Sequence, residues 1–114
     1  MANTDRLQLA HQFYRAFMSG DREFYEDHLS SDFTFSSPLD VGLDRAGYFE
    51  RCWPGAGQGG RIDFVRFIES IDEAVITYES TSPNGSKGRN TEIMGFDGDK
   101  INNVEVYFGW DVRP

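Results

Sequence analysis

The sequence predicts a single α+β domain, in which three helices from the N-terminal half pack against a curved, cone-shaped antiparallel sheet. Two observations favour this fold class. Apolar residues recur at helical spacing early in the chain and at strand spacing from residue 61 onward. The 114 residues also include ten Phe, five Tyr and two Trp. Because rigid rings pack in few geometries, a small domain built from them is expected to enclose an apolar pocket.

The first half of the chain predicts two helices in succession. Asn3 or Thr4 is the expected N-cap of the first helix, and Gly20 is placed to end it. Its apolar face would comprise Leu7, Ala10, Phe13, Tyr14, Phe17 and Met18. Asp21 can cap a short second helix, in which Phe24, His28 and Leu29 would form the buried stripe.

A short strand and a third helix are expected next. Phe33 and Phe35 alternate with polar residues until Pro38, which is typical of a strand. Asp44 is the expected cap of the third helix, which ends at the Trp53–Pro54 pair. Its apolar side chains would be Tyr48, Phe49 and Cys52. Residues 55–60 then form a glycine-rich flexible lid or connection. These residues match the glycine pattern of dinucleotide-binding loops. Such loops need a strand before them and a helix after them, whereas here the sequence predicts a helix before and a strand after.

The second half predicts four strands, at residues 62–70, 74–81, 87–96 and 101–110, with turns at 83–85 and 97–98. In the last strand Val104, Val106 and Phe108 are expected to face inward. Tyr107 and Trp110 then leave an apolar outer sheet face, which predicts a homodimer formed through that face.

Composition excludes several classes of function. The net charge of −8 disfavours nucleic acid and anionic membranes as partners, and no segment is apolar over the length of a membrane span. Cys52 is the only cysteine and the first ten residues contain no signal-like apolar run, so a cytoplasmic location is expected. The spacing of His and Cys offers no metal site, and no cofactor is expected. One domain, residues 1–114, accounts for the chain.

Three segments resemble the nuclear transport factor 2-like superfamily, in particular its SnoaL-like branch of ketosteroid isomerase and polyketide cyclase relatives. They are residues 13–21 (FYRAFMSGD), 31–38 (SDFTFSSP) and 96–101 (FDGDKI). The resemblance covers nearly the whole chain and implies a cystatin-like cone. It does not imply one function, because the superfamily contains isomerases, cyclases, dehydratases, epoxide hydrolases and transport factors.

The match to ketosteroid isomerase in this resemblance is partial. The isomerase's general-base aspartate falls on Ser37, which cannot take that role unaided. Its oxyanion-hole tyrosine falls on Phe13, with Tyr14 adjacent, and its oxyanion-hole acid falls on Glu92. A desolvated Glu92 would have a raised pKa; it could donate a hydrogen bond to a carbonyl when neutral or accept a proton when ionised. The alternative is a half-exposed Glu92 paired with an arginine.

Glu92, Tyr14 and His28 are therefore the candidate catalytic residues, although a histidine in the position of His28 is more often a buried, hydrogen-bonded core residue. The candidate ligand contacts are mostly aromatic, and their alternative role is ordinary core packing. They are Phe17, Phe35, Ser37, Phe49, Trp53, Tyr78, Asn90, Met94, Val106 and Phe108. Two functions are compatible with this set: cofactor-free acid–base catalysis on a small apolar carbonyl compound, or a non-catalytic module for ligand binding or protein assembly.

Overall fold

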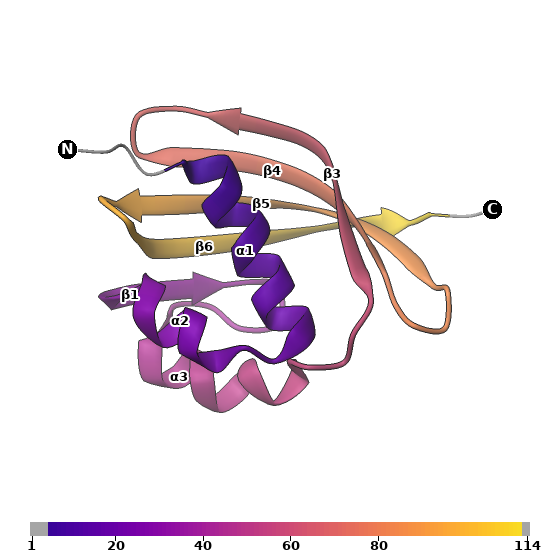
Figure 1. Cartoon of the computed structure of the whole chain (residues 1–114), viewed down its shortest axis with the longest axis horizontal. Helices are drawn as coiled ribbons and strands as arrows, with labels where there is room; N and C mark the ends of the chain where they lie inside the picture. Colours follow the sequence, from indigo (N-terminus) through magenta and orange to yellow (C-terminus); the bar gives the residue numbers. More distant parts are fainter. Residues whose placement is uncertain (1–4, 113–114) are drawn as a thin grey trace.

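Three helices cover one face of a six-stranded sheet in the computed structural model, which describes residues 5–112 (Figure 1). The helices are α1 (Arg6–Ser19), α2 (Arg22–His28) and α3 (Arg45–Arg51), with a 3₁₀ turn η1 (Trp53–Gly55). The strands are β1 (Leu29–Ser36), β2 (Leu43–Asp44), β3 (Arg61–Glu69), β4 (Glu73–Thr81), β5 (Lys87–Asp97) and β6 (Lys100–Asp111). The α+β fold class is confirmed.

The sheet has the strand order β2-β1-β6-β5-β4-β3 and curves around α1 without closing (Figure 1). Strands β3 to β6 form the expected antiparallel meander. The sheet is mixed rather than wholly antiparallel, because β1 pairs with β6 in parallel. Parallel neighbours need a long crossover, and here the whole of α3 and β3 to β5 lies between them in the chain. The sheet therefore joins the two halves of the sequence.

Local capping explains where the helices begin and end. Asp5 caps α1 by accepting a hydrogen bond from the backbone N–H of Gln8 at 3.1 Å; Asn3 and Thr4, the predicted caps, lie outside the described residues. Gly20 ends α1 in the left-handed conformation, with φ of 80°. The predicted caps of α2 and α3, Asp21 and Asp44, both accept a backbone N–H three residues on.

The buried stripe of α2 was predicted wrongly. Tyr25 is fully buried in α2, whereas Phe24 and His28 are only partly buried; Leu29 is buried but already belongs to β1. In a helix of seven residues two stripes are compatible with the apolar pattern, and the Tyr25 ring stacks on Phe13 of α1 at 4.6 Å between centroids. The packing of α1 decides which stripe faces inward.

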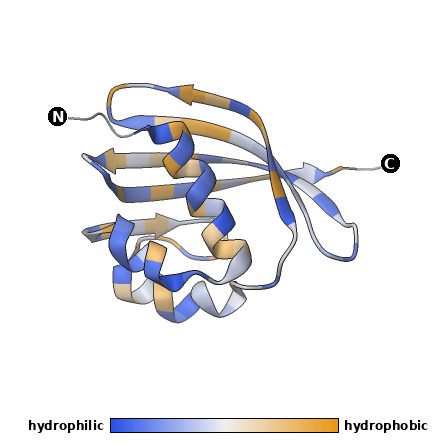
Figure 2. Cartoon of the chain, viewed as in Figure 1, coloured by the Kyte–Doolittle hydropathy of each residue, from blue (hydrophilic) through white to orange (hydrophobic). Residues whose placement is uncertain are grey.

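One end of the sheet projects beyond the helices, and the β4–β5 turn there is mostly hydrophilic (Figure 2). Val104 is buried and Val106 partly buried, but Phe108 is 55% exposed, contrary to the prediction that it faces inward. Phe108 keeps the register of Val106, since it pairs with Asn90 as Val106 pairs with Glu92, and it is exposed because this end of the sheet projects beyond the helices (Figure 2). A β-bulge follows at Gly109, which no residue of β5 opposes. A Cβ atom at Gly109 would lie 2.2 Å from the carbonyl oxygen of Arg89, so only glycine fits the bulge.

Candidate functional site

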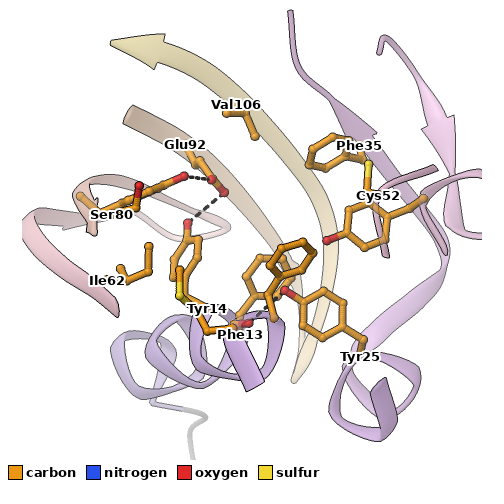
Figure 3. A pocket seen from close by; sticks show the side chains of 13 residues that line it. Phe13, Tyr14, Tyr25, Phe35, Cys52, Ile62, Ser80, Glu92 and Val106 are labelled. Atoms are coloured by element: carbon orange, nitrogen blue, oxygen red, sulfur yellow. Dashed lines mark hydrogen bonds between the residues drawn. The ribbon is translucent and has the colours of Figure 1, made fainter. Parts of the chain in front are cut away.

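A cavity of about 250 Å³ lies between the sheet and the helices, and its walls are predominantly apolar (Figure 3). Residues from α1, α2, α3, β1 and β3 to β6, together with Cys52, line it. They are Phe13, Tyr14, Phe17, Met18, Tyr25, Phe35, Tyr48, Cys52, Ile62, Tyr78, Ser80, Glu92 and Val106. Aromatic rings from the helices and the sheet thus form much of the cavity wall, and the expectation that the domain holds a ligand there stays a prediction.

Glu92 is the one acidic side chain in the cavity wall, and it is only 5% exposed. It sits on β5 opposite Val106 of β6 and Ile76 of β4, so its neighbours in the sheet are apolar. Two tyrosine hydroxyls donate to its carboxylate: Tyr14 to Oε1 at 2.9 Å and Tyr78 to Oε2 at 2.5 Å (Figure 3). The carboxylate of Glu92 in β5 thus accepts hydrogen bonds from one tyrosine of α1 and one of β4.

Burial sets the electrostatics of this cluster. Desolvation raises the pKa of Glu92 to about 7, and the hydrogen bonds from Tyr78 and Tyr14 oppose that rise. Desolvation, followed by the charge of Glu92, raises the pKa of Tyr14 and Tyr78, so both remain protonated donors near neutral pH. The Nδ2 of Asn90 donates to the Tyr78 hydroxyl at 3.4 Å. Glu92 is therefore a carboxyl group that can both accept and donate a proton near neutral pH.

A second group of polar side chains lies in the wall formed by α2 and α3. The Tyr25 hydroxyl donates to the carbonyl oxygen of Phe13 at 2.9 Å. The rings of Tyr25 and Tyr48 are nearly parallel, 6.0 Å apart. Burial raises the pKa of Tyr48, and hydrogen bonding with Tyr25 lowers it in part. Burial also raises the pKa of the neighbouring Cys52 thiol, which leaves this wall uncharged.

The structure brings six predicted site residues to the cavity: Tyr14, Phe17, Phe35, Tyr78, Glu92 and Val106. Tyr14 rather than Phe13 reaches Glu92, because Phe13 stacks on Tyr25 instead. Asn90 lies one contact away, behind Tyr78. The acid and its two donors were thus named from sequence, but Tyr78 only as a ligand contact.

The remaining predicted residues do not line the cavity. His28 is partly buried, stacks on Phe24, and its Nδ1 lies 2.9 Å from the Phe24 carbonyl oxygen, so it packs within α2 and lies outside the cavity wall. The Ser37 hydroxyl accepts the backbone N–H groups of Leu39 and Asp40 in a loop. Met94 is buried in the core, and Trp53 packs against another aromatic ring at its edge. Arginine side chains cover Phe49, and Phe108 is exposed on the surface.

Sequence reasoning did not assign seven of the lining residues to the site. Tyr48 and Cys52 were expected in the core of the third helix, and Phe13 and Met18 on the apolar face of the first. Tyr25, Ile62 and Ser80 carried no prediction about the site. The tyrosines among them could have been recognised from the sequence, because a buried tyrosine hydroxyl needs a hydrogen-bond partner and therefore indicates a polar position in an apolar wall.

The glycine-rich segment 55–60 is a connection that is hydrogen-bonded to α1. The N–H of Gly57 donates to the carbonyl of Phe17 at 2.8 Å, and the N–H of Gly59 to that of Met18 at 3.0 Å. These carbonyls belong to the last turn of the helix, which otherwise lacks partners for them. The segment therefore holds two cavity-lining residues in place.

Within residues 5–112 no group of His, Cys, Asp or Glu side chains could hold a metal ion. No helix in the same range is long and apolar enough to cross a membrane.

No protein-family model and no curated protein matches the sequence, whereas solved structures match the fold closely. An NTF2-like protein of unknown function from Cytophaga hutchinsonii has a TM-score of 0.69 at 20% identity, over 96% of this chain and 93% of its own. The chain has the fold of the NTF2-like (nuclear transport factor 2-like) proteins. This confirms the fold implied by the sequence resemblance.

Two further structures with this fold have been associated with ligands or activities. A protein from Kribbella flavida, proposed to be a ketosteroid isomerase, has a TM-score of 0.73 at 14% identity, over 94% of this chain and 79% of its own. TerC, crystallised with polyporic acid, has a TM-score of 0.72 at 22% identity, over 93% of this chain and 92% of its own. At these identities the similarity establishes the NTF2-like fold of this chain.

Proposed function

We propose that this NTF2-like protein binds a small, apolar carbonyl compound in the cavity and transfers a proton at the carbon next to the carbonyl, without a cofactor. One observation carries the proposal: Glu92 is buried in an apolar wall, and two tyrosine hydroxyls donate to it. At about 250 Å³ the cavity lies just below the usual range of about 300–1,000 Å³ for ligand pockets. A ligand of one or two fused rings suits that size.

The arrangement of the three side chains suits a proton transfer that uses a single base. The ionised carboxylate takes a proton from the carbon, and the electron pair of the C–H bond forms the enolate. Glu92 is then neutral and holds the hydroxyls of Tyr14 and Tyr78 less strongly, because charge strengthens a hydrogen bond. One hydroxyl is thereby released to donate to the enolate oxygen. Glu92 then returns a proton to the carbon, which completes the cycle and restores the carboxylate. When the neutral carboxyl group exchanges its proton with D₂O before this return, the carbon receives deuterium instead.

Exchange of the C2 protons of 1-tetralone in D₂O, followed by proton NMR, tests this mechanism. We expect catalysed exchange whose rate rises with pH through about 7, since the carboxylate is the base and burial raises the pKa of Glu92 to about 7. The variant Glu92→Gln should lose about 10²-fold or more of the rate, while 1-tetralone still protects the protein from thermal unfolding. Equal exchange rates for both proteins would contradict the role of Glu92.

A non-catalytic binding protein is the second candidate function. The observation that favours it is the position of Ser37, which turns into a loop and leaves the cavity with Glu92 as its single acid–base group. Such a protein would bind 1-tetralone without catalysing exchange. TerC, which was crystallised with polyporic acid, supports the use of this fold for a small organic ligand under either candidate function.

We also propose a homodimer through the outer face of the sheet. The support is the exposed aromatic end of β6, where Tyr107 is 54% and Trp110 65% exposed. Sedimentation velocity should show a dimer that the double variant Tyr107→Ala, Trp110→Ala converts to monomer. Val41→Ala, at an exposed apolar residue in the loop between β1 and β2, is the control. An unchanged mass for the double variant would rule this interface out.

A further inference from the structure

Asn90 connects the bulge of β6 to the acid of the cavity through two hydrogen bonds. It lies on β5 two residues before Glu92, so both side chains project from the same face of the sheet. Its Oδ1 accepts the backbone N–H of Gly109 at 3.2 Å, and its Nδ2 donates to the hydroxyl oxygen of Tyr78 at 3.4 Å. Tyr78 in turn donates to Glu92 at 2.5 Å. One series of donors therefore runs from Gly109 through Asn90 and Tyr78 to Glu92.

The backbone of Gly109 fixes the direction of this series. A backbone N–H can only donate, so the atom of Asn90 that faces Gly109 must be the carbonyl oxygen Oδ1. The amide nitrogen then faces Tyr78 and donates to its oxygen, which leaves the single hydrogen of that hydroxyl for Glu92. Bulges often redirect a group beside a functional site. The bulge at Gly109 supplies the backbone donor that orients the Asn90 amide.

The two tyrosines that donate to Glu92 differ in what supports them. Among residues 5–112 the Tyr14 hydroxyl makes a single hydrogen bond, which is the one to Glu92 at 2.9 Å. The Tyr78 hydroxyl lies closer to the carboxylate and also accepts from Asn90. A donor to a hydroxyl oxygen polarises the O–H group and makes it a stronger donor. In agreement with this, the hydrogen bond from Asn90 lowers the pKa of Tyr78 against the effect of burial.

We propose that Asn90 is a positioning residue of the acid–base site: held by Gly109, it keeps the Tyr78 hydroxyl on Glu92 and strengthens its hydrogen bond to the carboxylate. As a role in catalysis this rests on the proposed function, to which it adds control over the pH at which Glu92 becomes a base.

The other titratable groups in the cavity wall leave this control to hydrogen bonds. Burial raises the pKa of each of them, so they are uncharged near pH 7, and the lining residues of β1, β3 and β6 do not titrate. The groups are Tyr14 of α1, Tyr25 of α2, Tyr48 of α3, Tyr78 of β4, and Cys52.

Titration of the Glu92 carboxyl group by carbon NMR tests this inference without a ligand. Glutamate is labelled with ¹³C at the side-chain carboxyl, and the Glu92 signal is the one missing from Glu92→Gln. Asn90→Leu has a similar shape but cannot donate, so the pKa of Glu92 should rise by about 0.3–0.5. The rise is smaller than the roughly one unit expected for Tyr78→Phe, because a bond of 3.4 Å is long and acts through a second bond.

A double variant and a control separate positioning from general damage to the fold. In Tyr78→Phe, adding Asn90→Leu should move the pKa of Glu92 by less than about 0.1, since the residue that connects them is gone. Thr91→Val removes a hydroxyl that is hydrogen-bonded to Thr77, on the opposite face of β5, and should leave that pKa unchanged. Asn90→Val, whose branched side chain suits a strand, repeats the test if Asn90→Leu does not fold.

Exchange of 1-tetralone protons supplies the catalytic measurement. A raised base pKa lowers the ionised fraction only below the midpoint near pH 7. Asn90→Leu should therefore be about twofold to threefold slower than wild type at pH 6 and equal to it at pH 8.5. An unmoved carboxyl pKa, additive shifts in the double variant, or an equal loss of rate at both pH values would overturn the inference. Exchange with an unmoved pKa contradicts only this inference, whereas a shifted pKa without exchange in the wild type contradicts only the proposed function.

Discussion

Replacing Glu92 with Gln should change how stability depends on pH, in a direction fixed by the burial of the carboxyl group. The pKa of Glu92 rises from 4.5 to about 7 on folding, because burial disfavours the charged form. Between those values the folded chain binds the proton more tightly than the unfolded chain, so stability falls as pH rises. At about 1.4 kcal/mol for each pH unit, the wild type loses about 3 kcal/mol in total. Gln has the same shape and does not titrate.

Urea unfolding of both proteins at pH 5, 6, 7 and 8.5 measures this effect. The other carboxylates contribute equally to both proteins, so the difference in unfolding free energy isolates Glu92. We expect the Gln variant to gain about 2–3 kcal/mol relative to wild type between pH 5 and pH 8.5. Most of this gain should accumulate below pH 7. A difference that stays constant with pH, or that changes in the opposite direction, would refute the description of Glu92 as a desolvated acid.

Three further changes have definite expected results. Tyr78→Phe removes a hydrogen bond that lowers the pKa of Glu92, so the midpoint of the pH–rate profile for tetralone exchange should move up by about one unit; an unmoved midpoint would contradict this. Gly109→Ala should lower the free energy of unfolding in urea by about 2 kcal/mol. At Gly88 a Cβ atom would have its nearest neighbour 4.0 Å away, so the control Gly88→Ala should change that free energy far less. Asp44→Ala should lower stability by about 1 kcal/mol through loss of the α3 cap, and a thermal midpoint equal to wild type would show that the cap contributes nothing.

The helix starts and strand limits were predictable because single residues determine them locally. Asp21 and Asp44 cap their helices as expected, and each of the four later strands begins and ends within one residue of its prediction. What failed depends on contacts between distant segments. The choice of Tyr25 over His28 depends on α1, and the exposure of Phe108 depends on how far the helices extend along the sheet, which alternation alone does not reveal.

The sequence predicted the central acidic residue of the site, Glu92, but it predicted fewer of the residues that line the cavity around it. Glu92 and Tyr14 lie 78 residues apart. The family resemblance placed Phe13 beside Glu92 and left Tyr14 as its neighbour, so it came within one residue of the pair that the structure shows. The resemblance gave no role to Tyr48, and helical spacing alone cannot separate a cavity wall from a core. The predicted cytoplasmic location remains an expectation from the sequence.

The parallel pairing of β1 with β6 determines when the cavity can form. Phe35 of β1 lies beside Val104 of β6, 69 residues later in the chain. Contacts of such long sequence separation form late in folding, since the loop that they close is entropically unfavourable. During synthesis, β1 and β5 would expose unpaired edges until the last strand emerges. A chain that ends before residue 100 therefore lacks the strand that joins β1 to β5, and it presents two open strand edges that favour aggregation.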